Sequence, residues 1–148
     1  MKIEKNFKEF IELLNKNKVR YLIVGGYAYS YYVEPRFTKD IDFLIESTEE
    51  NAQKILQTLK DFGFESIKLG PSDLLEPDQI IQLGIAPLRI DLITSISGTN
   101  FKDAWKNKTI GKYGDAKAFF ISKFDLIKNK KATGRKQDLA DVEKLEKI

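Results

Sequence analysis

Two short apolar runs, separated by a glycine pair and a proline, restrict the fold of this chain most. Tyr21–Val24 is β-branched and aromatic and ends at Gly25-Gly26, which predicts a buried strand followed by a break. Pro35 lacks a backbone donor and ends the next segment, and a second apolar run follows at Asp40–Ile45. The pattern predicts a strand, a short helix and a second strand.

The remaining periodicity completes a predicted order of helices and strands. Apolar residues recur at helical spacing near the N-terminus and predict a helix over 4–17. Further helices are expected at 27–32, 49–61, 101–106, 123–131 and 137–147, further strands at 64–69, 79–85, 88–94 and 118–121, and tight connections at Gly70-Pro71 and Ala86-Pro87. We therefore predict one α/β (α+β) domain over residues 1–148, with helices flanking a mixed sheet and a short helical tail at 118–148.

The composition excludes several kinds of site. The 148 residues include no cysteine and no histidine, which removes zinc–thiolate sites and nucleophiles activated by histidine. Any catalysis must use carboxylates, lysines, arginines and hydroxyls, and any metal must have oxygen ligands. No signal peptide or membrane-spanning stretch is evident, so we expect a cytoplasmic protein with no membrane partner.

The charges are unevenly distributed along the chain. Residues 34–91 contain 12 acidic and 6 basic residues, whereas residues 101–136 contain 11 basic and 3 acidic residues. An acidic region that faces a basic one suits metal ions and a polyphosphate, although lysine-rich surface helices are also common.

Three aspartates form the candidate catalytic group. Asp40 and Asp42 stand at i and i+2 of one predicted strand, so both side chains point to the same face and could hold a hard divalent cation. Asp91 lies in another apolar run, where a buried carboxylate needs a partner. If the two strands are neighbours, the three acids can hold two metal ions. Alternatively, the acid pair belongs to a surface turn, and Asp91 forms an ion pair with Arg89.

The Gly25-Gly26 pair is a candidate phosphate site. It follows a strand and precedes a helix, where glycine permits close backbone approach and unpaired N–H groups favour an anion. By itself the pair could be only a tight turn.

Taken together, these features resemble the DNA polymerase β-like nucleotidyltransferase superfamily. The shared features are the strand, Gly25-Gly26, a 13-residue spacer, Asp40-Ile41-Asp42 and a later Asp91. The chain is most similar to small members related to AbiEii-type toxins, whose Arg-x-Thr-x-Asp-Ile-Asp run matches Arg36 to Asp42. The resemblance spans roughly residues 18–145.

The resemblance implies a function and a set of site residues. It implies that Asp40, Asp42 and Asp91 are catalytic and bind two Mg²⁺ ions (or Mn²⁺), and that the glycine pair holds the triphosphate of a nucleotide such as ATP. The enzyme would transfer a nucleoside monophosphate to a hydroxyl of RNA, a protein or a small molecule. The resemblance also suggests a role as the toxin of a toxin–antitoxin pair, with an antitoxin as partner. The further nucleotide-binding residues expected are Arg36, Thr38, Lys39, Lys130, Arg135 and Asp138.

Other interpretations stay open from the sequence. The basic residues of the tail could instead form ion pairs with Asp138 and Asp141 on a solvated face. The domain could bind a nucleotide or a partner without catalysis. A metal-dependent nuclease would also use three acids, although the glycine pair counts against it because a nuclease needs no triphosphate site.

Overall fold

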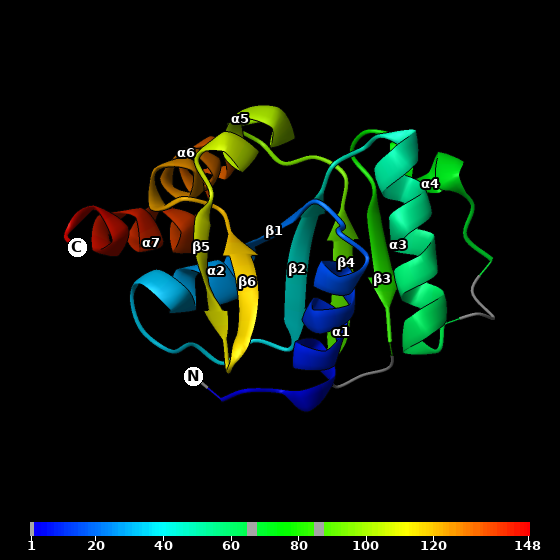
Figure 1. Ribbon diagram of the computed structural model, residues 1–148. Coiled ribbons are helices and arrows are strands. Elements are labelled where there is room, and N and C mark those ends of the chain that lie inside the picture. Colours follow the sequence, from blue (N-terminus) through cyan, green and yellow to red (C-terminus); the bar gives the residue numbers. More distant parts are fainter. Residues whose placement is uncertain (1, 65–67, 85–87) are drawn as a thin grey trace.

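A six-stranded mixed sheet organises the computed structural model, which describes residues 2–64, 68–84 and 88–148 (Figure 1). The strands lie in the order β3-β4-β2-β1-β6-β5. Their bounds are β1 Tyr21–Val24, β2 Asp40–Ile45, β3 Ile80–Leu83, β4 Arg89–Ile93, β5 Thr109–Tyr113 and β6 Ala116–Phe120. The helices are α1 Lys5–Lys16, α2 Gly25–Tyr32, α3 Glu49–Phe62, α4 Pro71–Leu75, α5 Phe101–Lys106, α6 Lys123–Thr133 and α7 Lys136–Glu146.

The middle of the sheet combines antiparallel and parallel pairs. β1 runs antiparallel to β2, whereas β2 runs parallel to β4, with Asp42 opposite Asp91 in the register. β1 and β6 are also parallel. Since parallel neighbours require long crossover connections, helices must pack on the sheet, as the predicted α/β (α+β) class requires.

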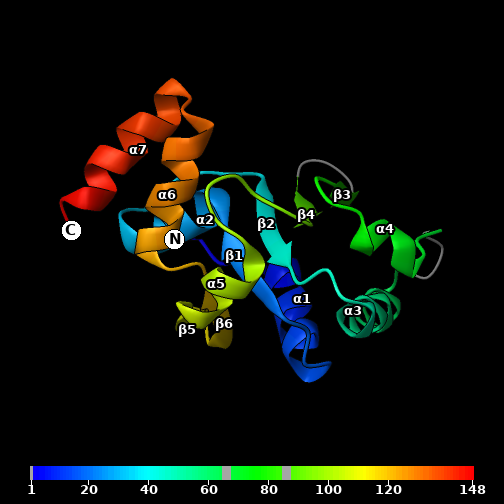
Figure 2. The ribbon, with the colours of Figure 1, turned by 90° about the horizontal axis from the view of Figure 1, so that it is seen from above.

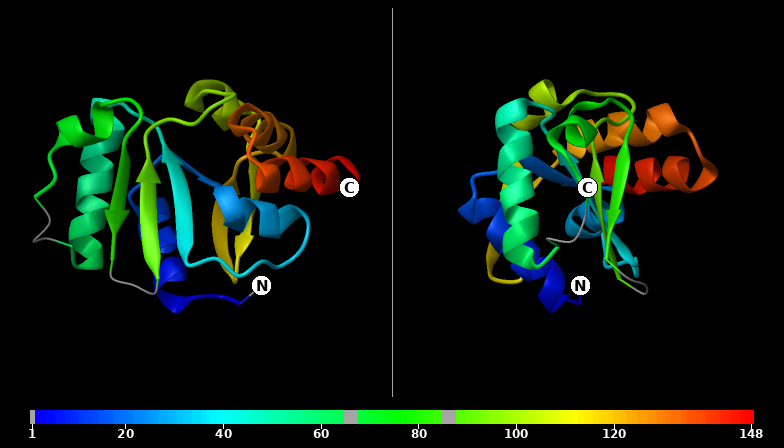
Figure 3. Two further views of the ribbon diagram at one scale, coloured as in Figure 1. Left: turned by 180° about the vertical axis from the view of Figure 1, so that it is seen from behind. Right: turned by 90° about the vertical axis from the view of Figure 1, so that its right-hand side faces the viewer.

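The helices cover the two faces of the sheet unequally. One face carries the larger apolar core, in which α1 and α3 pack against Ile41 and Phe43 of β2 and against Ile90 and Leu92 of β4. On the other face, α2, α6 and α7 pack around Leu22 and the β1–β6 half of the sheet. Viewed from behind, β2, β4 and β3 have no helix in front of them (Figure 3, left). One face of the β2–β4 pair is therefore accessible.

Local signals explain where several helices begin and end. Thr48 caps α3, its hydroxyl accepting a hydrogen bond from the Asn51 backbone N–H, and Gly63 ends that helix with a φ of 101°. Ser122 caps α6 in the same way, and Gly134 ends it with a φ of 65°. The tail therefore folds as two helices with a sharp turn between them.

The structure corrects the predicted elements in three places. Gly70-Pro71, predicted as a turn, begins α4, because proline is favoured in the first turn of a helix and Gly70 is its N-cap. Residues 109–113, for which no strand was predicted, form β5 at the sheet edge, antiparallel to β6. Of the predicted strand at 64–69, the described residues Phe64, Lys68 and Leu69 are not in a strand, and its other residues lie outside the described part of the chain, as does the Ala86-Pro87 connection.

Candidate active site

The three predicted aspartates lie on the accessible face of the sheet. Ile41 and Phe43 enter the core beneath α1 and α3, so Asp40 and Asp42 must point to the opposite face. Asp42 and Asp91 are directly opposite each other in the parallel β2–β4 pair. Asp91 is buried, and Asp42 and Asp40 are partly exposed. The strand pairing thus brings together side chains 49 residues apart in sequence.

The glycine turn lies against one of these carboxylates, that of Asp42. Gly25 follows β1 with a φ of 66°, and a Cβ atom at this position would lie 2.4 Å from Oδ2 of Asp42. A side chain would therefore be strained and would collide with the acid. Gly25 is also the first residue of α2, whose N-cap Val24 has no polar side chain with which to cap the helix. The uncapped N–H groups of α2 thus begin beside Asp42.

Arg89 links the acids in the structure. Its Nε donates a hydrogen bond to Oδ1 of Asp91 at 2.9 Å, and its Nη2 donates one to Oδ2 of Asp40 at 2.8 Å. Nη2 is also 3.3 Å from Oδ2 of Asp91. The ion pair between Asp91 and Arg89, one of the two interpretations of the sequence, is therefore present, and it joins the acids of two strands.

One guanidinium does not neutralise three carboxylates. Burial and the neighbouring charges of Asp91 and Asp40 raise the pKa of Asp42 to about 7, against a smaller opposing effect of Arg89. Asp42 makes no ion pair with any described residue, whereas Asp40 and Asp91 each pair with Arg89. The site therefore has an excess of negative charge, centred on Asp42.

The acids do not form a ready-made metal cluster. Within residues 2–64, 68–84 and 88–148, no group of three or more acidic side chains is arranged to hold an ion. Arg89 instead lies between Asp40 and Asp91. The donor atoms are nevertheless of the kind that a hard divalent cation prefers, because all of them are carboxylate oxygens.

The loop before β2 packs against the glycine turn. A Cβ atom on Gly26 would meet the Thr38 side chain at 3.4 Å, and the Thr38 hydroxyl donates to the Asp40 carbonyl at 3.2 Å. The carbonyl of Lys39 accepts a hydrogen bond from the Arg89 backbone N–H at 3.0 Å, while the Lys39 side chain is exposed. The structure thus places Thr38 between Gly26 and the start of β2, and Lys39 beside the start of β4.

Arg36 of this loop turns toward the C-terminal helices. Its two terminal nitrogens donate to both oxygens of Asp141, at 2.9 and 2.6 Å, and its guanidinium lies 3.8 Å from the ring centroid of Tyr29. Asp141 also accepts hydrogen bonds from Lys130 at 2.8 Å and from Gln137 at 2.9 Å. The tail cluster, defined here as Arg36, Lys130, Asp138 and Asp141, therefore fixes the loop to α6 and α7.

The other tail residues pair among themselves. Asp138 accepts hydrogen bonds from Nε of Arg135 and from the Thr133 hydroxyl, both at 2.7 Å, and lies 3.7 Å from Nζ of Lys130. In the described part of the chain, the ion-pair partners of Lys130 and Arg135 all belong to α7. The structure thus contains the ion pairs to Asp138 and Asp141 that were the alternative to nucleotide binding.

Asp141 was considered from the sequence only as a partner of basic residues in the tail, and its pairing with Arg36 was not predicted. Burial opposes its charged form, yet hydrogen bonds from Arg36, Lys130 and Gln137 hold the pKa of this carboxyl well below its usual range. Its pairing with Arg36 spans 105 residues, so a local pattern could not identify it.

The comparisons with solved structures agree on the fold. The chain is 20% identical to the lincomycin-bound lincosamide antibiotic adenylyltransferase LnuA, with a TM-score of 0.61 over 98% of this chain and 97% of that one. It is 20% identical to a candidate nucleotidyltransferase from Thermotoga maritima, with a TM-score of 0.57 over 95% of this chain and 86% of that one. An antigenic nucleotidyltransferase-like protein from Paracoccidioides brasiliensis gives 15% identity and a TM-score of 0.56 over 97% and 76% of the two chains.

The family comparison identifies the class of protein. No curated protein sequence matches the chain. No helix in the described ranges has the length and apolar character needed to cross a bilayer. A family model described as a nucleotidyltransferase of unknown function, DUF6036, matches residues 2–147. The chain therefore belongs to the DUF6036 family of nucleotidyltransferases.

Proposed function

We propose that this nucleotidyltransferase moves a nucleoside monophosphate from a nucleoside triphosphate to an acceptor hydroxyl, with release of pyrophosphate, at Asp40, Asp42 and Asp91. The observation that carries the proposal is the register of β2 and β4, in which Asp42 is opposite Asp91 while Gly25 touches Asp42. The acids and the uncapped start of α2 therefore lie within one small region.

The electrostatics suit a divalent cation at these acids. Burial and the neighbouring charges of Asp91 and Asp40 together raise the pKa of Asp42, and the carboxylate oxygens suit two Mg²⁺ ions, or Mn²⁺. Such ions, when bound, neutralise charge on the triphosphate and lower the pKa of the acceptor hydroxyl. Asp40 and Asp42 would contact both ions and Asp91 one of them. This arrangement requires Arg89 to release Asp40 and Asp91.

The chain's own residues would orient the substrates. The N–H groups at Gly25 and Gly26 would hold the phosphates, supported by the dipole of α2. Asp91 would also accept the proton of the acceptor hydroxyl. Thr38 and Lys39 lie near enough to the glycine turn to contact the phosphates. We also propose that the nucleotide contacts Lys130, Arg135 and Asp138. These contacts would require the ion pairs of the tail cluster to rearrange.

The acceptor is proposed by class only. LnuA, an adenylyltransferase of a lincosamide antibiotic, matches the chain almost end to end, which supports a small-molecule acceptor and ATP as the donor. RNA and protein hydroxyls are the other candidates, and a toxin role with an antitoxin rests on the resemblance to AbiEii-type toxins. A nucleotide-binding domain without catalysis is the alternative function.

Label transfer tests the proposal. The protein would be incubated with each α-labelled nucleoside triphosphate and Mg²⁺, together with RNA, protein or a panel of hydroxylated small molecules. We expect label on one acceptor class with the native chain and none with the Asp40→Ala/Asp42→Ala variant. Binding of a triphosphate without transfer to any acceptor would contradict the proposal and favour the inactive binder. Cleavage of RNA without incorporation of label would favour a nuclease.

A further inference from the structure

A pocket separate from the acid site lies at the end of β1 that is remote from the glycine turn. Arg20 precedes β1, whereas Gly25 follows it, so the strand separates this pocket from the acids. Seen from above, α5 lies over this end of the molecule beside β5 and β6 (Figure 2). The pocket has a volume of about 270 Å³ and is lined by Asn15, Lys18, Val19, Arg20, Trp105, Lys117 and Phe119. We call it the Trp105 pocket.

Aromatic rings form part of its wall. Trp105 of α5 packs edge-on against Phe119 of β6, with ring centroids 5.3 Å apart and planes at 70°. Trp105 also stacks on Phe101, with centroids 5.6 Å apart and planes at 20°. These contacts fix the indole ring, which is still partly exposed. A fixed and partly exposed indole offers aromatic surface against which another ring can pack.

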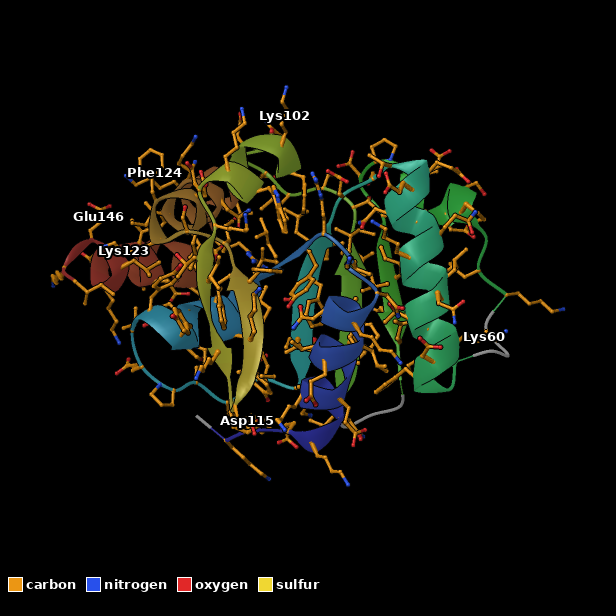
Figure 4. All side chains as sticks on the ribbon, viewed as in Figure 1. Lys60, Lys102, Asp115, Lys123, Phe124 and Glu146 are labelled. Atoms are coloured by element: carbon orange, nitrogen blue, oxygen red, sulfur yellow. The ribbon has the colours of Figure 1, made fainter. Side chains whose placement is uncertain are left out.

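Cations surround the rings. Nζ of Lys108 lies 4.0 Å and the Arg20 guanidinium 5.6 Å from the Trp105 ring centroid, and Nζ of Lys117 lies 5.1 Å from that of Phe119. Among the described residues, neither Lys18, Lys108 nor Lys117 forms an ion pair, and Arg20 has only an exposed contact with Glu46 at 3.3 Å. Lys102, also on α5, points outward at the top of the molecule (Figure 4). The pocket therefore has uncompensated positive charge.

We propose that the Trp105 pocket binds a nucleotide unit of a single-stranded nucleic acid. Interleaved aromatic rings and cations are the arrangement that holds single strands, because each base stacks on a ring while its phosphate meets a cation. The base would displace the Lys108 ammonium from the ring and stack on Trp105, and the phosphate would contact Lys18, Arg20 and Lys117. A duplex hides its base faces and could not use the indole surface.

This site goes beyond the proposed function. It would anchor a strand at a distance from the acids, and its binding requires neither a triphosphate nor a metal ion. Failure of one proposal therefore leaves the other intact. If both hold, the anchored strand would present RNA to the nucleotidyl-transfer site.

Intrinsic fluorescence gives a direct test, because Trp105 is the only tryptophan. A short oligouridylate would be titrated into the full chain without metal or triphosphate. We expect quenching of Trp105 emission that weakens with salt. Lys117→Glu should weaken binding by about tenfold or more, since it reverses the charge beside a phosphate. Lys60→Glu makes the same charge change on α3, away from the pocket (Figure 4), and should bind almost as well as the native chain.

The indole itself is tested with a labelled strand. Fluorescence anisotropy of a labelled oligouridylate should show binding about tenfold or more weaker for Trp105→Ala, which removes the stacking surface. Equal losses in Lys117→Glu and Lys60→Glu would overturn the proposal, because the attraction would then be diffuse. Equally tight binding of a duplex, or of uridine monophosphate alone, would overturn it too. Circular dichroism would verify that each variant is folded.

Discussion

The acid site on β2 and β4 and the tail cluster are both groups of carboxylates with cations, but their charges are balanced differently. In the tail cluster, Arg36 and Lys130 both donate to Asp141. At the acid site, Arg89 alone pairs with both Asp40 and Asp91, and Asp42 pairs with no cation among the described residues.

The pKa values follow this difference. The pKa of Asp141 is held below its usual range, whereas that of Asp42 is raised to about 7. A carboxylate with enough donors stabilises the fold, and one without them stores unfavourable charge that a bound cation can relieve. The tail cluster thus joins the loop before β2 to α6 and α7, and the excess charge at the acid site supports the proposal that this site binds a cation.

The largest expected effect is on catalysis. Asp42→Asn removes the charge of a proposed metal ligand while keeping the shape of the side chain, so we expect label transfer to fall by about 10³-fold or more. Asp141→Asn, the matched change in the tail cluster, should retain far more turnover under conditions in which it is folded. Equal activity of Asp42→Asn and the native chain would contradict the distinction between the two regions.

The free energy of unfolding should depend more on the tail cluster than on the acid site. Asp141→Asn leaves Arg36 and the buried Lys130 without their shared carboxylate, so we expect the free energy of unfolding to fall by about 3 kcal/mol. Chemical denaturation would measure this loss. Glu34→Gln, which breaks only the exposed pair with Lys144, serves as the control and should cost less than about 1 kcal/mol. A loss for Asp141→Asn as small as that of the control would mean that the tail cluster does not hold α6 and α7 in place.

The two regions should also differ in their dependence on pH. Because folding raises the pKa of Asp42 from 3.8 to about 7, the folded state binds the proton more tightly in this range. The contribution of Asp42 to the free energy of unfolding should therefore fall by about 3 kcal/mol as the pH rises from about 4 to about 7. The lowered pKa of Asp141 has the opposite sign, so its stabilisation is complete above its ordinary pKa and is lost as the pH falls below it.

Denaturation of the metal-free protein at several pH values measures both slopes. Asp42→Asn should flatten the profile between pH about 4 and about 7 and leave the loss at lower pH unchanged. An unchanged slope in this range would show that Asp42 does not carry the unfavourable charge.

The smallest expected effect concerns Arg89. The Arg89 guanidinium forms ion pairs with Asp40 and Asp91 and so competes with a metal ion for these carboxylates. Arg89→Gln removes this competition, and the apparent affinity for Mg²⁺ should rise by about tenfold. The shift of the melting temperature with Mg²⁺ concentration would report the affinity. Lys39→Gln removes an exposed cation near the same acids and is the matched control. A weaker affinity in Arg89→Gln would instead make Arg89 part of the cation-binding arrangement.

Much of the fold follows from local sequence patterns. The apolar runs at β1, β2 and β4 and the periodicity of α1 and α3 predicted a mixed sheet flanked by helices, which the structure confirms. Elements with weak local signals were missed. β5 contains Thr109, Gly111 and Lys112, which give little local strand signal. It forms a strand because it pairs with β6 at the edge of the sheet.

The site was predictable only in part. Alternation along a strand places Asp40 and Asp42 on one face, but the register of β2 and β4 is needed to put Asp91 opposite Asp42. The same register explains the contact of Arg89 with Asp40, which no local sequence pattern predicted. Pairing across long separations, as between Arg36 and Asp141, depends on the packing of the whole domain.

The most direct test of the central claim is a count of bound metal ions. Mn²⁺ would be titrated into the protein with a non-hydrolysable nucleoside triphosphate analogue, and free Mn²⁺ would be followed by its electron paramagnetic resonance signal. We predict two nucleotide-dependent ions for the native chain and for Glu34→Gln, and a loss of at least one of them in Asp42→Asn. The same number of ions, bound with the same affinity, in Asp42→Asn and the native chain would contradict the claim that these acids form the nucleotidyl-transfer site.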